Sequence, residues 1–210
     1  MKKVIIIGSG ISGLIFAREL KKVGINPIII DKGFSVGGRI ASRPFNDSFF
    51  DHGAQYFTSK SNYFENLVQE LLENNIVKIL DEENGKKKYI GINGMNSITQ
   101  YLSKDLNISQ KECVIKISYE KDKWILETDK NNNFETKSII LTAPVPQSIL
   151  LSESGNFKIP LDLKTELEKV KYSRCIALIG KFKNPLLISK FDNHKSYKKI
   201  DNDNVISWVS

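Results

Sequence analysis

The sequence GSGISG at residues 8–13 has the glycine spacing of the GxGxxG motif. It follows an apolar run, precedes a stretch with helical spacing, and an acid, Asp31, ends the next apolar run. In this context Gly8 allows a tight turn, Gly10 lets a pyrophosphate approach the backbone, and Gly13 allows a helix to pack closely on a strand. These residues therefore predict a dinucleotide-binding loop.

Asp31 favours some dinucleotides over others. Its carboxylate can accept hydrogen bonds from the adenosine ribose hydroxyls, whereas it would repel a 2′-phosphate. The helix expected after Gly10 adds free N–H groups and a positive dipole end for the pyrophosphate. The alternative interpretation of the motif is a glycine turn without a ligand. With Asp31 in place, the pattern predicts NAD or FAD rather than NADP.

A second glycine cluster, which follows Asp31, favours FAD over NAD. Gly37 and Gly38 expose another run of N–H groups soon after Asp31, and Arg39 adds a guanidinium suited to phosphate. A plain NAD fold seldom needs two phosphate loops, whereas a longer, buried dinucleotide does. A flexible turn and a surface salt bridge are the alternatives for these residues. Taken together, the two loops favour FAD.

A third glycine lies among aromatic residues. Gly53 and Ala54 leave room for a flat ring beside the backbone, and Gln55 is a neutral donor and acceptor suited to a ring edge or a substrate amide. His52 stands beside an acid in a turn and is interpreted as a structural hydrogen-bonder rather than a base. No catalytic residue is assigned. No His, Cys or carboxylate pair has metal-ligand spacing, so no metal is predicted.

The elements that position these residues follow from the spacing of apolar residues. Buried strands are expected at residues 3–8, 26–31 and 137–144, and further strands at 86–92, 174–182 and 204–210. Helices are expected at 11–23, 61–74, 95–106 and 162–170, and an antiparallel hairpin at 113–129. The alternation of strand, helix and strand at the N-terminus predicts a parallel sheet.

The fold class is therefore α/β. We expect a Rossmann-like FAD-binding domain, with a parallel sheet and an antiparallel hairpin, together with part of an α+β substrate domain. The discontinuous FAD-binding domain would comprise residues 1–57 and 86–150. The partial substrate domain would comprise residues 58–85 and 151–210.

Composition limits the partners and the compartment. The chain of 210 residues is 40% hydrophobic and 26% charged, with a net charge of +7. The lysines are scattered among acids and amides, which favours a solvated surface over nucleic-acid binding. The apolar N-terminal run is too short for a signal peptide or a membrane span. Cys113 and Cys175 lie far apart in apolar runs and are expected to be buried thiols, which predicts a cytoplasmic protein.

The segment at residues 8–43 resembles the FAD-binding head of the flavin amine oxidase superfamily. Three further segments are similar to its renalase-like branch: FDHGAQYFT at 50–58, GINGMNSITQYL at 91–102 and LTAPVPQ at 141–147. The resemblance covers nearly the whole chain, in order.

The resemblance implies a set of cofactor contacts. They are, in chain order, Gly8, Gly10, Ile11, Ser12, Gly13, Asp31, Lys32, Gly38, Arg39, Ser42, Arg43, Gly53, Ala54, Gln55, Val114, Ala143 and Pro144. The first loop and residues 38–43 would reach the phosphates, Asp31 the ribose, and Val114 the adenine side through its backbone. Residues 53–55 would lie by the isoalloxazine ring. Ala143 and Pro144 would close over the cofactor, and Gly94 and Met95 would start a helix facing the flavin.

The resemblance also implies an activity. The protein would be an FAD-dependent oxidoreductase that transfers a hydride from a small reduced substrate to FAD, with O₂ as the acceptor and hydrogen peroxide as the product. Renalase-like proteins oxidise misreduced isomers of dihydronicotinamides, which makes these the first expected substrates. Amine, porphyrinogen and carotenoid-type substrates belong to sibling branches and stay open.

The length of the chain raises a second possibility. Members of the family are considerably longer and return to the first sheet with a later FAD segment. The alternatives to an active enzyme are a truncated, non-catalytic FAD-binding remnant and one half of a split flavoprotein whose partner chain supplies the C-terminal half. In either case, the runs at 174–182 and 204–210 are expected to present an apolar face and an unpaired strand edge that includes Trp208.

Overall fold

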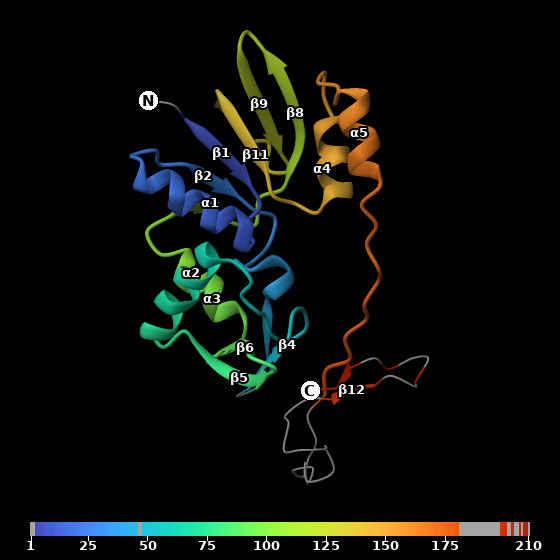
Figure 1. The fold of residues 1–210 in the computed structure, drawn as a ribbon. Helices are drawn as coiled ribbons and strands as arrows, with labels where there is room; N and C mark the ends of the chain where they lie inside the picture. Colours follow the sequence, from blue (N-terminus) through green and yellow to red (C-terminus); the bar gives the residue numbers. More distant parts are fainter. Residues whose placement is uncertain are drawn as a thin grey trace. The chain divides into compact units, whose positions relative to one another are not determined.

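The apolar run near the N-terminus forms a central strand of a parallel sheet. β1 (Val4–Ile7) lies between β11 (Ser138–Leu141) and β2 (Ile28–Ile30), and β2 pairs with β7 (Asn107–Ser109). All three pairings are parallel. α1 (Ile11–Lys22) connects β1 to β2 (Figure 1), so the predicted Rossmann-like strand–helix–strand unit is confirmed.

The computed structural model describes residues 3–45, 48–180, 198–200, 203, 206 and 208–209. The chain forms two compact units, Met1–Ile176 and Ala177–Ser210. The first unit holds the parallel sheet and every residue that the sequence predicts at the cofactor. Within the described residues, no helix combines the length and the apolar character needed to cross a bilayer.

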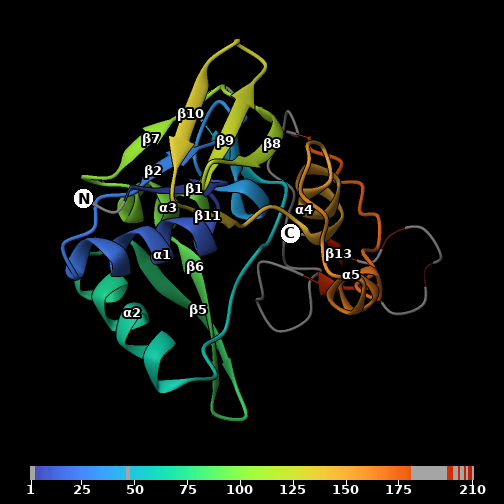
Figure 2. The same ribbon diagram turned by 90° about the horizontal axis from the view of Figure 1, so that it is seen from above.

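Alternating side chains of the central strands build two separate cores, because successive residues of a strand point to opposite faces. On one face, Ile6 and Ile29 pack with Leu14 of α1 and Ile98 of α3 (Asn96–Leu102). On the other face, Ile5 packs against an antiparallel sheet. That sheet consists of β8 (Val114–Glu120), β9 (Lys123–Thr128) and β10 (Asn133–Thr136). Figure 2 shows α1 and the β8–β10 sheet on opposite sides of the parallel sheet.

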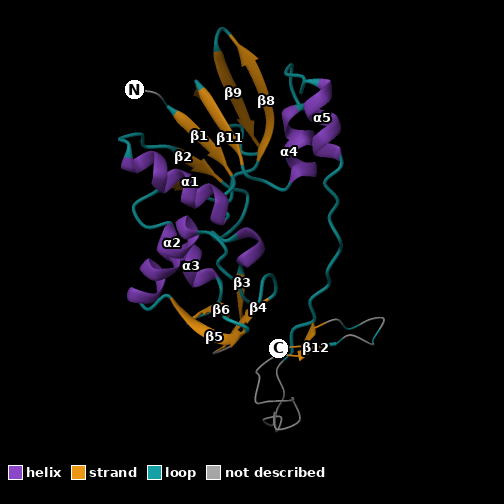
Figure 3. Ribbon diagram, viewed as in Figure 1, coloured by secondary structure: helices purple, strands orange, loops and turns teal. Residues whose placement is uncertain are grey.

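The remaining elements of the first unit are hairpins and helices (Figure 3). They are the 3₁₀ helix at Gly38–Ile40, β3 (Ser42–Phe45), β4 (Ser48–Asp51), α2 (Asn62–Glu73), β5 (Val77–Glu83), β6 (Lys86–Gly91), α4 (Val145–Ser152) and α5 (Leu161–Glu168). β3 pairs with β4, and β5 pairs with β6, both antiparallel. α2 lies beside β5, and α3 lies beside β6.

Most of the predicted helices are confirmed, with different ends. α2 occupies the expected helix at 61–74, and the Ser61 hydroxyl caps it by accepting the Phe64 N–H at 3.3 Å. α5 lies within one or two residues of its expected bounds. The helix expected at 95–106 ends at Leu102. Its last turn is lost where Asp105 adopts a φ of 59°, which a helix cannot contain.

The strand expected at residues 174–182 is wrong for 174–180, which form neither strand nor helix. Ile176 is 96% exposed and Leu178 is 98% exposed. An apolar run becomes a strand only where a neighbouring strand accepts and donates its backbone hydrogen bonds, and no described strand pairs with this segment. Residues 181 and 182 lie outside the described residues.

The expectation for the two cysteines is also wrong. Cys113 is half-buried just before β8, and Cys175 is exposed in the segment that does not form a strand. The apolar residues around each thiol suggested a strand interior. Burial fails because Cys113 precedes its strand and Cys175 has no strand to belong to.

In the second unit, β12 (Lys198–Lys199) pairs antiparallel with β13 (Trp208–Val209). The strand expected at 204–210 is therefore described at 208–209, and the rest of it, Ile206 excepted, lies outside the described residues. Trp208 pairs with Lys199 along one edge of its strand, and the unpaired edge expected there stays a prediction. The predicted boundary between residues 85 and 86 falls inside the β5–β6 hairpin, and the division into two domains stays a prediction.

Candidate functional site

The first glycine loop connects β1 to α1. Each of its three glycines meets a different structural requirement. Gly8 has a φ of +111°, which side-chain-bearing residues rarely adopt. A Cβ at Gly13 would overlap with the carbonyl oxygen of Gly8, so the helix can approach the turn only without a side chain there. At Gly10, by contrast, a Cβ would meet no atom within 4 Å. The space beside Gly10 is therefore open, on the side where the sequence predicts a pyrophosphate.

The N-terminus of α1 offers hydrogen-bond donors to that space. Gly10 is the N-cap and provides no side-chain cap. Leu14 donates its N–H to the Gly10 carbonyl at 3.0 Å, but the N–H groups of Ser12 and Gly13 have no acceptor within the described part of the chain. The Ser9 hydroxyl is buried and has no partner there either. A helix end of this kind favours a bound anion.

The second glycine loop lies directly against the first. Gly37 donates its N–H to the Ser9 carbonyl at 3.1 Å, and Gly10 and Gly37 form an isolated parallel bridge. A Cβ at Gly38 would lie 3.7 Å from the Gly10 Cα. Gly37 and Gly38 both have positive φ, at 133° and 57°. Two loops that are separate in the sequence thus form one continuous glycine surface.

Asp31 joins this surface at the end of β2. One carboxylate oxygen accepts the Ser9 N–H at 2.5 Å, and the other accepts the Gly33 N–H at 2.6 Å. These bonds fix the carboxylate beside the first loop. A carboxylate has about four lone-pair sites, so Asp31 keeps the capacity to accept hydroxyl donors from a ribose.

The end of β11 also reaches the first loop. The Thr142 hydroxyl lies 2.9 Å from the Ile7 carbonyl oxygen and 3.1 Å from that of Gly8. A Cβ at Gly8 would lie 3.6 Å from the Ala143 nitrogen. The structure therefore brings Ala143 to the glycine surface, and Pro144 follows it as the N-cap of α4. Sequence reasoning missed Thr142, although a hydroxyl at the end of a buried strand is a signal for such a bond.

Arg39 and the start of α4 share one neighbour, Tyr172. The Arg39 guanidinium lies 5.8 Å from the centre of the Tyr172 ring, and the Val145 N–H donates to the Tyr172 hydroxyl at 3.3 Å. Arg39 is exposed at the rim of the site. Tyr172 therefore links the second loop to the segment after β11, which sequence reasoning did not foresee.

The third glycine packs on the second loop. Ala54 donates its N–H to the Arg39 carbonyl at 3.0 Å, and a Cβ at Gly53 would overlap with the same oxygen. The Gln55 amide donates to the Asp51 carbonyl. Contact with Arg39 is thus a sufficient reason for glycine at residue 53. The place of residues 53–55 beside a flavin ring stays a prediction.

Ser42 lies where β3 meets the start of α3. Its hydroxyl donates to the Asp51 carboxylate and accepts the Asn96 N–H at 3.0 Å, while Asp51 accepts the Met95 N–H at 2.8 Å. Ser42 is buried, and Arg43 after it is exposed. These bonds hold the residues after the second loop against α3.

The segment that leads to Val114, where the sequence predicts the adenine, lies beside Asp31. Asp31 donates its N–H to the Ser109 carbonyl at 2.9 Å, and its own carbonyl accepts the Glu112 N–H at 3.0 Å. Val114 is buried at the start of β8, and Lys32 is exposed next to Asp31. Sequence reasoning missed Glu112, because a single acid in the polar stretch QKEC is typical of an exposed turn.

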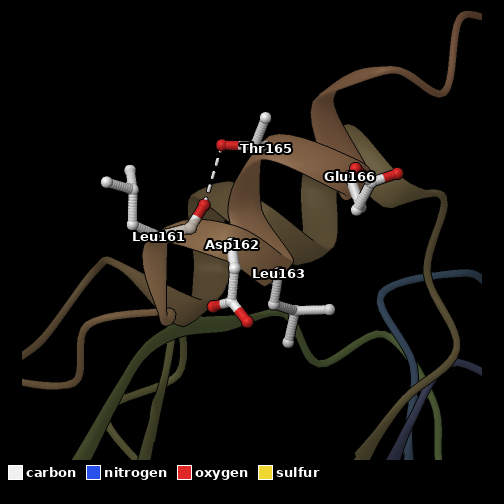
Figure 4. Close-up of a pocket in the computed structure, with 5 residues that line it drawn as sticks. All are labelled: Leu161, Asp162, Leu163, Thr165 and Glu166. Carbon is white, nitrogen blue, oxygen red and sulfur yellow. Dashed lines mark hydrogen bonds between the residues drawn. The ribbon is translucent and has the colours of Figure 1, made fainter.

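A wide, shallow hollow of ≈ 750 Å³ lies elsewhere, on the surface of α5. Figure 4 shows its lining, Leu161, Asp162, Leu163, Thr165 and Glu166, with the Thr165 hydroxyl donating to the Leu161 carbonyl at 2.8 Å. None of these residues belongs to the glycine surface. Among the described residues, no group of three His, Cys, Asp or Glu is placed to hold a metal ion.

A parallel sheet, a helix N-terminus, two joined glycine loops and an acid at the end of the second strand define a dinucleotide-binding α/β protein. Residues 6–72 match the model of the NAD(P)-binding Rossmann-like domain. Residues 76–205 match the model of the flavin containing amine oxidoreductases, which is more than half of the chain. The chain belongs to the flavin-containing amine oxidoreductase family.

Individual relatives agree with this assignment. Mouse (Mus musculus) renalase is 31% identical over an alignment of 196 residues that covers 85% of this chain and 57% of renalase. A Dictyostelium discoideum protein named "Probable flavin-containing monoamine oxidase A" is 32% identical over 106 residues, 50% of this chain and 22% of that protein. The chain thus spans less than two thirds of the length of either relative. The predicted renalase-like resemblance is confirmed.

The fold has a counterpart among solved structures. A protein named "Putative protoporphyrinogen oxidase", from Exiguobacterium sp. 255-15, superposes with a TM-score of 0.64 and 12% identity over 80% of this chain and 63% of that one. Membership of a flavin-containing family makes FAD the cofactor of this chain. The open space at Gly10, the free N–H groups of α1 and the unpartnered Ser9 hydroxyl fit such a group.

Proposed function

We propose that this chain forms the FAD-binding part of an FAD-dependent oxidoreductase that oxidises a small reduced substrate. The observation that supports the proposal most is the hydrogen bond from the Gly37 N–H to the Ser9 carbonyl. It joins two glycine loops into one surface of backbone donors beside an open space. A single loop would serve any dinucleotide, whereas two joined loops suit a longer, buried dinucleotide such as FAD.

The roles proposed for the residues follow from their positions. The α1 N-terminus, including Ile11 and Ser12, stabilises the pyrophosphate through backbone N–H groups and the helix dipole. Gly38 and Arg39 approach it from the second loop, with Arg43 adding positive charge. Asp31 accepts hydrogen bonds from the ribose, and the backbone of Val114 bounds the adenine.

The chemistry supplied by bound FAD would be acceptance of a hydride from the substrate, with two electrons and two protons then going to O₂ to give hydrogen peroxide. The chain's own contribution is orientation and exclusion of water. Residues 53–55 are proposed to line the ring, with the Gln55 side chain held by the Asp51 carbonyl. Ala143 and Pro144 are proposed to cover the cofactor where β11 ends.

Isomeric dihydronicotinamides are the proposed substrates. The proposal is supported by the likeness to renalase over 85% of this chain and by the DHGAQYF segment. Such donors are already activated for hydride loss, so no strong acid or base is required. Sibling substrates, amines and porphyrinogens, are the competing outcomes of the test.

The remaining proposals concern the whole protein. Residues 1–57 and 86–150 are proposed to act as the FAD-binding domain, and residues 58–85 and 151–210 as part of the substrate domain. A partner chain that contributes to the substrate domain is also proposed, since this chain matches 57% of the length of mouse renalase. The cytoplasm is the proposed compartment, with both cysteines free.

Removal of the ribose acceptor tests the cofactor site. Asp31→Ala is expected to weaken FAD binding by roughly 1–3 kcal/mol, because hydrogen bonds to a charged acceptor are lost. Asp162→Ala, which removes an exposed carboxylate on α5, is the matched control and should bind FAD like the wild type. Quenching of flavin fluorescence during titration measures both. Equal affinity in the two variants would show that Asp31 does not face the cofactor.

Anaerobic reduction tests the substrate. Flavin bound to the protein should bleach rapidly when misreduced dihydronicotinamide isomers are added, and slowly with a simple monoamine. The reverse order of rates would place the protein with the amine-oxidising branch. A chain that binds FAD but is reduced by neither donor would support the non-catalytic alternative.

A further inference from the structure

A short segment beside Asp31 holds its backbone from the side opposite the first glycine loop. The Asp31 N–H donates to the Ser109 carbonyl at 2.9 Å, and the Glu112 N–H donates to the Asp31 carbonyl at 3.0 Å. The Lys111 N–H donates to the Gly33 carbonyl at 2.9 Å. Residues 109–112 therefore extend the β2–β7 pairing past the strand ends. The position of the Asp31 carboxylate depends on where this segment lies.

The Glu112 side chain fixes the segment from within. It is 4% exposed. One carboxylate oxygen accepts the Ser109 hydroxyl at 2.5 Å, and the other accepts the Thr128 hydroxyl at 3.0 Å and the Asn132 amide at 2.6 Å. Thr128 is the last residue of β9, and Asn132 ends the turn between β9 and β10. Glu112 thus ties the segment beside Asp31 to the antiparallel sheet.

A second bond strengthens the same connection. The Cys113 N–H donates to the Asp129 carboxylate at 2.9 Å, and the Asp129 N–H donates to the Cys113 carbonyl at 2.9 Å. These bonds are at the surface, whereas those of Glu112 are buried. Removing a hydrogen bond costs more free energy when the group left without a partner is buried than when it is exposed to water. This holds for a carboxylate that loses its donors and for donors that lose their carboxylate. Glu112 is therefore the member of the connection whose loss should move the segment.

We propose that Glu112 is a positioning residue for the adenosine half of the cofactor, holding Asp31 at the ribose through residues 109–112. The proposal rests on the function proposed for Asp31. The proposal gives the β9–β10 turn an indirect role in cofactor binding, although that turn lies outside both glycine loops. Glu112 acts through Asp31 and needs no contact with the cofactor itself.

A double-mutant cycle with ADP, the adenosine half alone, separates this role from general stability. Glu112→Ala should weaken ADP binding about tenfold, equivalent to about 1.4 kcal/mol. In an Asp31→Ala background the same substitution should have no further effect, because the contact that it positions is already absent. Glu112→Gln should recover most of the affinity, since its amide oxygen still accepts from Thr128 and Asn132.

Thr136→Val is the matched structural control. Thr136 is 3% exposed at the far end of β10, and its hydroxyl donates to the Lys3 carbonyl at 2.5 Å. This variant should be less stable to denaturant but bind ADP like the wild type. If Glu112→Ala does not fold, Asn132→Ala, which removes one of the three donors, should show a smaller loss with the same dependence on Asp31.

The positioning role would be overturned if the losses of ADP affinity caused by Glu112→Ala and Asp31→Ala simply added in the double variant. It would also be overturned if Glu112→Ala bound ADP with the same affinity as the wild type. Either result would leave the proposed function intact as long as the wild type binds FAD. A wild-type chain that binds neither ADP nor FAD would overturn the proposed function first and this inference with it.

Discussion

The apolar run at residues 4–7 and the segment at 174–180, which is apolar from residue 175 to 179, have opposite environments. Ile5 and Ile6 of the first run are 0% exposed. Ile176 and Leu178 of the second are 96% and 98% exposed. The first run pairs with a strand on each side, whereas the second pairs with no described strand. Both segments contain a run of apolar residues, and the neighbouring strands, which only the first run has among the described residues, account for the difference.

This contrast explains why the glycine surface is well defined. The first run is held between β2 and β11, and the ends of these three strands carry Gly8, Asp31 and Thr142. Burial of isoleucines on both faces of the sheet therefore positions the polar groups at its edge. The run at 174–180 positions nothing comparable, apart from the contacts that Tyr172 makes just before it.

The largest expected effect is on stability. Ile6→Ala should lower the free energy of unfolding by about 2–5 kcal/mol, because a fully buried side chain leaves a cavity. Leu178→Ala should change it by less than about 0.5 kcal/mol, because its side chain is exposed. Urea denaturation followed by circular dichroism measures both. A large loss for Leu178→Ala would mean that the second run is buried in solution.

Substitutions at two glycines extend the comparison between the packed N-terminal region and the exposed segment at residues 174–180. Gly13→Ala should destabilise the protein by about 1–3 kcal/mol, since its Cβ would overlap with the Gly8 carbonyl oxygen. Gly180→Ala should be nearly neutral, because a Cβ there would meet no atom within 4 Å. Thermal melts of the two variants test the pair. Equal melting temperatures would contradict the close packing of α1 on the turn.

The smallest expected effect is a pH dependence. Hydrogen bonds from Ser109 and Asn132 hold the pKa of the Glu112 carboxyl below its usual value of 4.5. A carboxyl with a lowered folded-state pKa stabilises the protein above the usual pKa, and loses that contribution as the pH falls through the folded-state value. The stability difference between the wild type and Glu112→Gln should therefore shrink as the pH falls below about 4.5. A difference that is constant with pH would show that Glu112 is not held as a carboxylate.

Much of the fold was predictable because local patterns and tertiary partners agree there. The runs at 4–7 and 28–30 are short, apolar and bounded by glycine or proline, and both became largely buried parallel strands. The run at 138–141 also became a parallel strand, but the expectation that it is buried is wrong, because Ser138 is exposed and the other three residues are half-buried. The run at 174–180 carries the same local signal without a partner strand. The spacing of apolar residues does not reveal that difference, because the strands that would pair with such a run come from elsewhere in the chain.

The candidate site was predictable in part for the same reason. The GxGxxG motif and Asp31 lie within one strand–helix–strand unit, so the dinucleotide-binding pattern can be recognised from the sequence alone. The contact between Gly37 and Ser9, the Thr142 hydroxyl and the buried Glu112 arise only when distant segments meet. Single polar residues such as these carry no periodicity, so only the folded structure distinguishes them from surface residues.

Gly10→Val gives the most direct test of the glycine surface as the pyrophosphate site. Gly10 has φ −72° and ψ 175°, which valine tolerates, and open space where its side chain would stand. We predict a melting temperature close to that of the wild type in the absence of ligand, together with loss of FAD binding in a fluorescence titration. A Gly10→Val variant that remains folded and binds FAD with wild-type affinity would contradict the assignment.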